Sequence, residues 1–226
     1  MIKKIIRKAH ILQNIYIKNR FWIKKKSYSM DNEDLKIVDY FKDIEMGFYI
    51  DVGCFHPIHW NNTYLLFKKN WSGINIDISE FSIDLFKHMR PDDLNYNFAI
   101  SNKSEKIKFY YQKQLSLLST IEMGQAKKVF QGNIKKKIIQ SYTLDAVLDM
   151  GKFKDKKIDF LNIDVEGADF KVLQGLSFKK YQPKLICIEI HNKDFKSDKS
   201  YKFLLEKGYE LIWNGVFSFI FESKMK

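Results

Sequence analysis

The segment FYIDVGCFHPIHWNNTYLLFKKNWSGINID, from Phe48 to Asp77, determines the predicted fold. It begins with an apolar strand at 48–52 and a glycine-bearing turn, continues with a short helix, and ends with a second strand at 73–77. The acids Asp51 and Asp77 lie at the ends of these strands. Such a turn presents backbone N–H groups to a ligand, and an acid at the end of the next strand can bind a ribose. The segment therefore predicts an α/β protein with a nucleoside-cofactor site.

The rest of the chain continues this alternation of strands and helices. Apolar runs predict strands, and amphipathic runs bounded by Pro, Gly or Asn predict helices. The expected strands are 94–100, 106–111, 158–163 and 185–190, with a hairpin of 209–213 and 216–221 turned at Asn214 and Gly215. The expected helices are 31–43, 61–69, one ending near Arg90, 142–150, 168–176 and 199–207. This order predicts a doubly wound, mostly parallel sheet whose last strand is reversed.

One segment of the chain lacks this clear pattern. From Leu115 to Gln140 the apolar period fades and polar residues dominate. We interpret residues 115–140 either as an insertion or lid over the site or as a plain surface loop and helix.

Length and charge predict one domain with an appendage. The 226 residues, 45% of them hydrophobic, suffice for one sizeable core. Residues 1–30 form a basic arm and residues 31–226 the domain. Nine of the twelve net positive charges lie before Asp31, which leaves +3 for the remainder. A nucleic-acid partner is therefore not expected from the domain itself.

The arm has the pattern of a basic amphipathic helix. Ile2, Ile5, Ala9, Leu12 and Ile15 recur at helical spacing among the cations. Such a helix can pack on the domain or a partner subunit, contact an anionic membrane surface through residues 1–26, or bind nucleic acid. No apolar run approaches the ~20 residues of a membrane span. We expect a cytoplasmic protein, with peripheral membrane contact as an option and with its oligomeric state, a dimer included, left open.

The first turn favours a cofactor without phosphates. Asp51, Gly53 and Pro57 stand as DxGxxxP, and bulky Phe55 and His56 occupy positions where a pyrophosphate needs glycines. S-adenosylmethionine is a nucleoside cofactor without phosphates. Gly53 would let the backbone approach it, and Asp77 would accept both ribose hydroxyls. The neighbouring Cys54 is either a small residue in a crowded turn or a catalytic thiol, and with Cys187 it indicates a reducing compartment.

Two further strand ends carry the remaining chemistry. Asp164 and Glu166 follow the strand at 158–163, and Glu189 and His191 close the strand at 185–190. Neighbouring strand ends would bring these side chains together. His191 with a carboxylate could act as a general base, and Asp164, Glu189 and His191 are alternatively candidates to hold a divalent metal ion. His56 and His59 are further candidates for contacts with a substrate or a metal.

Several motifs together resemble the FkbM family of S-adenosylmethionine-dependent methyltransferases. They are YIDVGCFHP, NNTYLLFKKNWSGINID, NFAIS, SYTLD, IDFLNIDVEGADFKVLQGL and ICIEIH, and the resemblance covers about residues 47–221. It implies a class I, Rossmann-like fold with a seven-stranded sheet. It also implies O-methylation of a sugar hydroxyl, in surface polysaccharide or other glycan biosynthesis.

The chemistry of these residues and the resemblance together suggest roles for individual residues. The catalytic candidates are Asp164, Glu166 and His191. The cofactor candidates are Asp51, Gly53, Cys54, Asp77, Ile78, Asn97, Phe98, Ala99 and Asp164, and the substrate candidates are His56, His59, Asn62 and Thr63. The turn departs from the usual glycine-rich pattern at residues 54–57.

Two other functions compete with this prediction. The basic arm would suit an RNA methyltransferase, although the chain lacks an NPPY-like segment for amine acceptors. A degenerate methyltransferase scaffold could instead serve as a membrane-surface adaptor without catalysis. The acceptor could be a free sugar, a nucleotide-linked sugar or a lipid-linked glycan.

Overall fold

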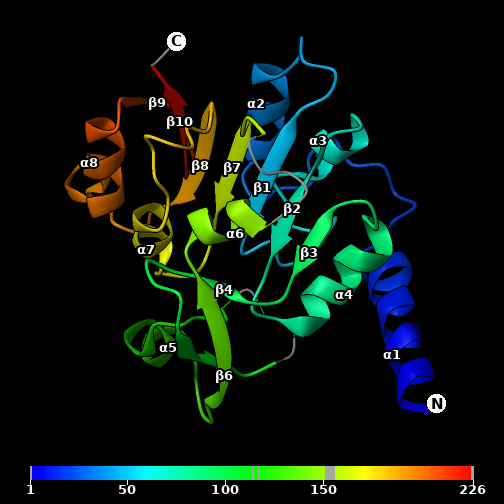
Figure 1. Ribbon diagram of the computed structural model, residues 1–226. Helices are drawn as coiled ribbons and strands as arrows, with labels where there is room; N and C mark the ends of the chain where they lie inside the picture. Colours follow the sequence, from blue (N-terminus) through cyan, green and yellow to red (C-terminus); the bar gives the residue numbers. More distant parts are fainter. Residues whose placement is uncertain (1, 114, 117, 151–155, 225–226) are drawn as a thin grey trace.

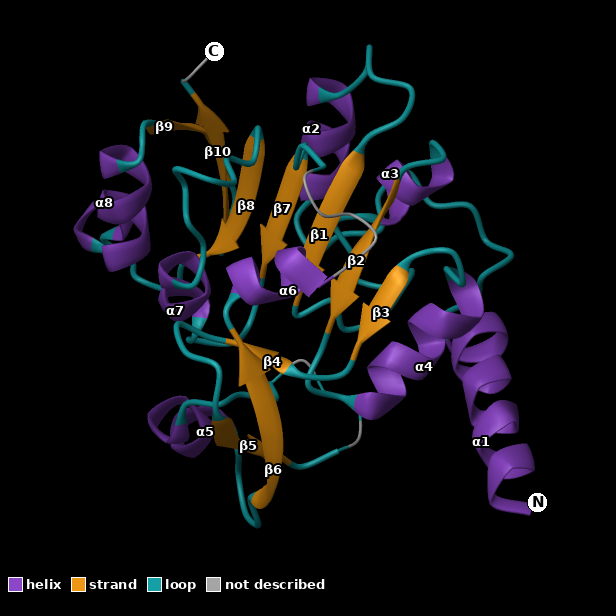
Figure 2. Ribbon diagram, viewed as in Figure 1, coloured by secondary structure: helices purple, strands orange, loops and turns teal. Residues whose placement is uncertain are grey.

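A seven-stranded sheet forms the centre of the molecule in the computed structural model, which describes residues 2–113, 115, 116, 118–150 and 156–224 (Figures 1 and 2). Its strand order in the described chain is β3-β2-β1-β7-β8-β10-β9, and β10 runs antiparallel to both its neighbours. The strands are β1 (Phe48–Val52), β2 (Ser72–Ile76), β3 (Leu94–Tyr96), β7 (Phe160–Ile163), β8 (Leu185–Glu189), β9 (Tyr209–Asn214) and β10 (Ser218–Ser223). The mostly parallel sheet with a reversed strand is therefore present.

Helices cover both faces of this sheet because the strands are apolar on both sides. In β1, Phe48, Ile50 and Val52 pack in one hydrophobic cluster, and Tyr49 packs in another on the opposite face. The first cluster includes side chains of α6 (Leu144–Met150), α7 (Asp169–Gln174) and α8 (Lys199–Glu206). The second includes side chains of α2 (Glu33–Tyr40) and α3 (Tyr64–Lys68), and α4 (Glu80–Met89) follows β2. A short 3-10 helix, η2 (Phe195–Ser197), precedes α8.

A second, three-stranded sheet lies beyond the carboxyl ends of the central strands (Figure 1). It consists of β4 (Ala99–Ile100), β5 (Lys106–Tyr111) and β6 (Lys135–Tyr142), with α5 (Met123–Val129) between the last two. The strands β1, β2, β7 and β8 are parallel, so their carboxyl ends share the edge that faces this small sheet. That edge is where open α/β sheets bind ligands.

Two expectations about elements need correction. The predicted strand 94–100 is divided, because β3 pairs with β2 and β4 pairs with β6 in the other sheet. The segment 115–140 contains a helix, α5, but also most of a strand that was not expected, β6, which pairs with β5 over six residue pairs. Leu117 of this segment lies outside the described residues.

The N-terminal segment packs against the domain. It consists of α1 (Ile2–Leu12), which lies along α4, and a π-helical turn, η1 (Gln13–Lys18). Arg7 forms ion pairs with Asp84 and Glu80 of α4. Ile15 is fully buried beside Ile58, Tyr64 and Leu85. Among the described helices, none has the length and apolar character that crossing a membrane requires.

Candidate functional site

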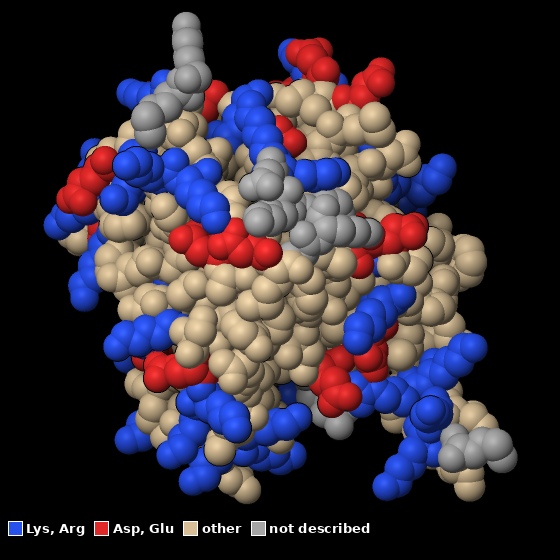
Figure 3. Space-filling model, viewed as in Figure 1, with Lys and Arg blue, Asp and Glu red and all other residues tan. Residues whose placement is uncertain are grey.

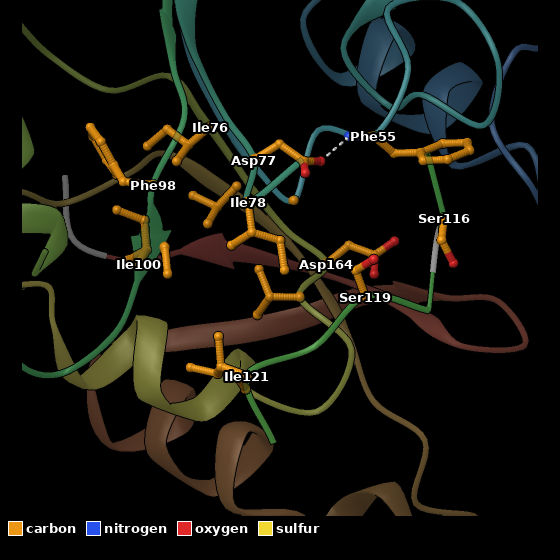
Figure 4. A pocket seen from close by; sticks show the side chains of 15 residues that line it. Phe55, Ile76, Asp77, Ile78, Phe98, Ile100, Ser116, Ser119, Ile121 and Asp164 are labelled. Atoms are coloured by element: carbon orange, nitrogen blue, oxygen red, sulfur yellow. Dashed lines mark hydrogen bonds between the residues drawn. The ribbon is translucent and has the colours of Figure 1, made fainter. Parts of the chain in front are cut away.

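A pocket opens at the carboxyl ends of β1, β2 and β7 (Figure 4). Its empty volume, the open mouth included, is about 570 Å³, a usual size for a small-molecule site. Most of its lining is apolar, so we call it the apolar pocket. It is lined by Val52, Gly53, Phe55, Ile76, Asp77, Ile78, Phe98, Ala99, Ile100, Ser116, Ser119, Ile121, Asp164, Val165 and Ala168. Six of the predicted cofactor residues thus meet in one place: Gly53, Asp77, Ile78, Phe98, Ala99 and Asp164.

Asp77 is the acid at the β2 side of the apolar pocket. One carboxylate oxygen accepts the Phe55 N–H at 2.8 Å (Figure 4). The other accepts the Ser79 N–H at 2.6 Å. Burial raises the pKa of Asp77 to about 6 in spite of these hydrogen bonds. A carboxylate offers about four lone-pair sites, so Asp77 can accept hydroxyl groups of a ligand in addition to these hydrogen bonds.

The first turn differs from the expected nucleotide-binding turn. The N–H groups of Gly53 and Cys54 both donate to the carbonyl of Ile76, at 2.9 and 3.2 Å, and are therefore not free for a ligand. The next helix, α3, begins only at Tyr64. Gly53 has φ +82°, and a Cβ there would lie 1.7 Å from the carbonyl oxygen of Asp164. The glycine is thus required by its close approach to β7 as well as by its backbone conformation.

Asp51 lies beneath this turn and does not line the apolar pocket. It is 1% exposed, and its carboxylate accepts hydrogen bonds from Asn61, Thr63 and Asn162. Burial raises the pKa of Asp51, while the hydrogen bond from Asn162 and the charge of Arg90 oppose that rise. The predicted cofactor acid is therefore the centre of a buried polar network.

Arg90 completes this network from the end of α4. Its guanidinium is 1% exposed and donates to Thr63 Oγ1 at 2.8 Å, to Asn61 Oδ1 at 2.9 Å and to the Pro57 carbonyl at 2.7 Å. These bonds hold three points of the loop between β1 and α3. The predicted substrate residue Thr63 is one of them and is fully buried.

A second, more polar pocket adjoins the first, and we call it the polar pocket. It is lined by Met30, Glu33, Asp51, Gly53, Cys54, Phe55, Trp60, Asn61, Asn62, Asn162, Asp164, Glu189, Phe217 and Ser218. Gly53, Phe55 and Asp164 line both pockets. Asp164 is therefore the ionisable side chain at the junction, where two bound molecules would meet.

Several carboxyl groups lie close together around this junction. Burial raises the pKa of Asp164 well above its usual range, and the carboxylates of Glu189 and Asp169 raise it further. Burial and Glu189 likewise raise the pKa of Glu166 to about 8 and that of Asp169 to about 7. Like charges in a buried site oppose each other's ionisation. Part of this group is therefore protonated near neutral pH, and its members are suited to proton transfer.

His191 lies behind Glu189 and does not line either pocket. Its Nε2 is 2.9 Å from a Glu189 carboxylate oxygen, and this hydrogen bond raises the pKa of His191. Ligating atoms of Glu166, Glu189 and His191 lie within 4.8 Å of one another, a spacing that could hold a metal ion. The predicted metal candidate Asp164 is not in this group, and Glu166 takes its place.

Other predicted site residues have structural contacts. His56 is 1% exposed, and its Nδ1 accepts the N–H groups of Ile58 and His59. Its Nε2 therefore carries the proton and donates to Asn14 Oδ1 at 2.9 Å, which ties the loop to the N-terminal segment. Burial lowers the pKa of His56 to about 3, which keeps the ring neutral.

The remaining predicted residues divide between the pockets and their surroundings. Asn62 lines the polar pocket, whereas His59 stacks on Trp60 with ring centroids 4.5 Å apart. The Asn97 side chain donates to the backbone carbonyl of Asp77 and lines neither pocket. Cys54 is buried, and this burial raises the pKa of its thiol well above the usual value. A catalytic thiolate at Cys54 is thus disfavoured.

Some residues that line the two pockets belong to no sequence motif and were not predicted as site residues. Ser116 and Ser119 line the apolar pocket from the LSLLST segment that precedes α5. Met30 and Glu33 reach the polar pocket from one end of the chain, and Phe217 and Ser218 reach it from the other. These four side chains, two apolar, one acidic and one hydroxyl, form no motif in the sequence.

Comparison with protein families matches residues 45–211 to the methyltransferase FkbM domain. The match covers most of the chain and includes β1, β2, β7, β8 and the ends of all four strands. A comparison with curated proteins gives no significant match.

Proposed function

This chain belongs to the FkbM methyltransferase family, and we propose that it is an S-adenosylmethionine-dependent O-methyltransferase of the class I fold acting on a sugar hydroxyl of a surface polysaccharide or another glycan. The observation that carries the proposal is the junction of two pockets at Asp164. One pocket is mainly apolar and bounded by a strand-terminal acid, and the other is lined by carboxylates, amides and an indole. A methyltransferase needs two such sites in contact.

The residues of the apolar pocket fit this cofactor. Ile78, Phe98 and Ile121 offer apolar surface to an adenine, and Asp77 offers carboxylate oxygens to ribose hydroxyls. The occupied N–H groups of Gly53 and Cys54 leave no phosphate cradle in the turn, which suits a nucleoside without phosphates. When bound, S-adenosylmethionine supplies an electrophilic methyl group on a positively charged sulfur.

The polar pocket fits a hydroxylated acceptor. The Trp60 indole, 43% exposed, offers a face for a sugar ring, while Asn62 and Glu189 offer hydrogen-bonding groups. A sugar hydroxyl is a weak nucleophile at neutral pH and must lose its proton as the methyl group is transferred. We assign proton acceptance to a carboxylate oxygen of Asp164, because this side chain touches both pockets. Glu189 orients the acceptor, and His191, bonded to Glu189, is a positioning residue.

A divalent ion at Glu166, Glu189 and His191 is a second way to activate the hydroxyl. Two carboxylates and an imidazole are a usual ligand set for such ions, and the three groups converge. Complete chelation separates the two routes: activity that survives chelation supports direct proton transfer to Asp164, and activity restored by added Mg²⁺ or Mn²⁺ supports the ion.

Substitution of Asp164 tests the proposed base. We expect Asp164→Asn to lower turnover by about 10² to 10⁴, the usual contribution of a general base. The dissociation constant for S-adenosylmethionine, measured by calorimetry, should change little, because the substitution keeps size and shape. Asp43→Asn is the matched control, since Asp43 is exposed and lines neither pocket. Methyl transfer from labelled cofactor to free, nucleotide-linked and lipid-linked sugars provides the activity assay.

Three results would contradict the proposal. Unchanged turnover in Asp164→Asn would remove Asp164 from the mechanism. Methylation of RNA, with salt-sensitive RNA binding, would favour the RNA methyltransferase. Failure to bind S-adenosylmethionine at millimolar concentration would favour an adaptor without catalysis.

A further inference from the structure

The amphipathic helix α1 contacts the domain through its polar side. At 3.6 residues per turn, Arg7 and Ile11 lie on one side of the helix. Arg7 pairs with Asp84 and Glu80 of α4, and Ile11 packs on the cluster around Ile15. An amphipathic helix of a globular protein ordinarily places its apolar side on the core. In α1 the opposite side faces the core.

The orientation of α1 is fixed by the chain that follows it. Ile15 in η1 is fully buried, and Tyr16 contacts His88 of α4 through both a hydrogen bond and ring packing. Asn14 accepts the hydrogen bond from the buried ring of His56. Rotation of α1 about its own axis would break these contacts together with the ion pairs of Arg7.

The apolar side of α1 is consequently exposed. Ile2 is 72% exposed, Ile5 61%, Ile6 50% and Leu12 37%. With the exposed Ala9 they form a continuous band that we call the apolar stripe: Ile2, Ile5, Ile6, Ala9 and Leu12. Two further apolar side chains of the arm, Trp22 at 75% and Ile17 at 72%, are exposed as well. This much exposed aliphatic and indole surface on one short segment indicates an interaction site.

The charges around the apolar stripe are positive. Lys3 lies on one flank and Lys8 on the other, and residues 1–30 contain no acid. A second basic group lies on the small sheet and the segment between β5 and β6 that includes α5, where the exposed lysines are Lys106, Lys108, Lys113, Lys127, Lys128, Lys135, Lys136 and Lys137. Figure 3 shows both groups at the lower end of the molecule, over α1 and over β5 and β6. The hollow between them is lined by three cations, Arg7, Lys113 and Lys137, and by one acid, Glu80.

We propose that this end of the molecule binds an anionic lipid bilayer, with the apolar stripe inserted at the level of the headgroups. Aliphatic side chains flanked by lysines, with an indole nearby, are the usual composition of interfacial helices. The lysines of the small sheet add attraction to acidic headgroups. A second copy of the chain is a poorer occupant, because it would bring another set of unpaired cations against the first.

Vesicle flotation with the full-length protein tests this proposal. We expect binding to vesicles of phosphatidylglycerol and phosphatidylcholine in equal parts, little binding to phosphatidylcholine alone, and weaker binding as salt is raised. Ile5→Gln with Ile6→Gln should reduce partitioning about tenfold or more, because each change removes aliphatic surface from the bilayer. Because the chain contains four tryptophans, the blue shift of tryptophan fluorescence that we expect on binding is assigned to Trp22 by its loss in a Trp22→Phe variant.

Leu205→Gln is the matched control, since Leu205 is 45% exposed on α8, away from α1 (Figure 1). Its partitioning should equal that of the unsubstituted protein. Equal binding to both kinds of vesicle, or no loss in the Ile5→Gln/Ile6→Gln variant, would overturn the proposal. A dimer in sedimentation experiments that dissociates in that variant would identify a second copy as the occupant instead. The test needs no methyl transfer, so its outcome is separate from that of the proposed activity.

Discussion

Gly53 illustrates how a single residue constrains both pockets. Its backbone is in the left-handed region at φ +82°, and the missing side chain lets β1 approach the Asp164 carbonyl. Gly132 has nearly the same conformation, φ +84°, but no heavy atom lies within 4 Å of the position of an added Cβ. An alanine at Gly132 would therefore meet only the cost of the backbone conformation, whereas an alanine at Gly53 would also overlap with Asp164.

We expect Gly53→Ala to be much more destabilising than Gly132→Ala. The backbone cost in Gly132→Ala is about 1–2 kcal/mol, and Gly53→Ala adds the overlap with Asp164, about 1–3 kcal/mol or more. Urea unfolding followed by circular dichroism measures both variants. Equal losses of unfolding free energy would show that Asp164 moves aside at little cost and that the close approach is unimportant.

We expect Asp77 to make cofactor affinity dependent on pH. Its pKa is raised to about 6 in the folded chain, from an ordinary value of 3.8. Its neutral form is thus favoured by folding, so its contribution to stability is largest below pH ~4 and is lost as pH rises through about 6. Binding of ribose hydroxyls requires the opposite form, the carboxylate, which prevails above about 6.

Affinity for S-adenosylmethionine should therefore fall as the pH is lowered, by about tenfold for each unit below about 6. Calorimetric titrations between pH ~7.5 and ~5 measure this dependence, and circular dichroism verifies that the chain stays folded. Asp77→Asn should bind weakly with little pH dependence over the same range. If both proteins show the same pH dependence, another group is responsible.

At the scale of elements, buried strands were predictable and irregular ones were not. The strands β1, β2, β7 and β8 lie within about two residues of their predicted positions, because sheet strands covered on both faces are continuous apolar runs. The strand predicted at 94–100 is interrupted at Asn97, whose side chain bonds to the Asp77 carbonyl. That long-range contact has no counterpart in the local sequence.

The strand β6 was not predicted because its first residues are lysines. Its first residues, Lys135, Lys136 and Lys137, are exposed and pair with Tyr111, Tyr110 and Phe109 of β5. A strand of a small, solvent-exposed sheet need not be apolar, and a run of lysines resembles a loop by composition. The net charge of +3 outside the arm is a sum over the whole domain, so it did not reveal that lysines gather on the small sheet.

For the whole molecule, the sequence indicated which acids lie at the candidate site but not which other residues line its pockets. Asp77, Asp164 and Glu189 were identifiable because they end strands whose carboxyl ends share one edge. His56 and Thr63 have polar side chains in the right loop, yet both are buried in structural hydrogen bonds. The polar side chains of His56 and Thr63 suggested that they bind a ligand. Because both are buried, neither lines either pocket.

The polar pocket is closed by the two ends of the chain. Glu33 is 2% exposed and accepts hydrogen bonds from the Ser218 hydroxyl and the Asp31 N–H, both at 2.7 Å. Asp31 in turn accepts the Val216 N–H at 2.8 Å. Neither Glu33 nor Ser218 lies within the segment matched to the methyltransferase FkbM domain. The shape of the polar pocket therefore depends on parts of the chain outside that segment.

This arrangement predicts a separation between acceptor and cofactor binding. Ser218→Ala removes a hydrogen bond to a buried carboxylate, which is worth about 1.5–3 kcal/mol, so the KM for the acceptor should rise roughly tenfold or more. The dissociation constant for S-adenosylmethionine should not change, since Ser218 and Glu33 do not line the apolar pocket. Tyr40→Phe is the matched control: Tyr40 bonds to Glu222 between the same two ends of the chain but lines neither pocket. If Tyr40→Phe raises the acceptor KM as much as Ser218→Ala does, the effect comes from general loosening of the chain ends and not from the wall of the polar pocket.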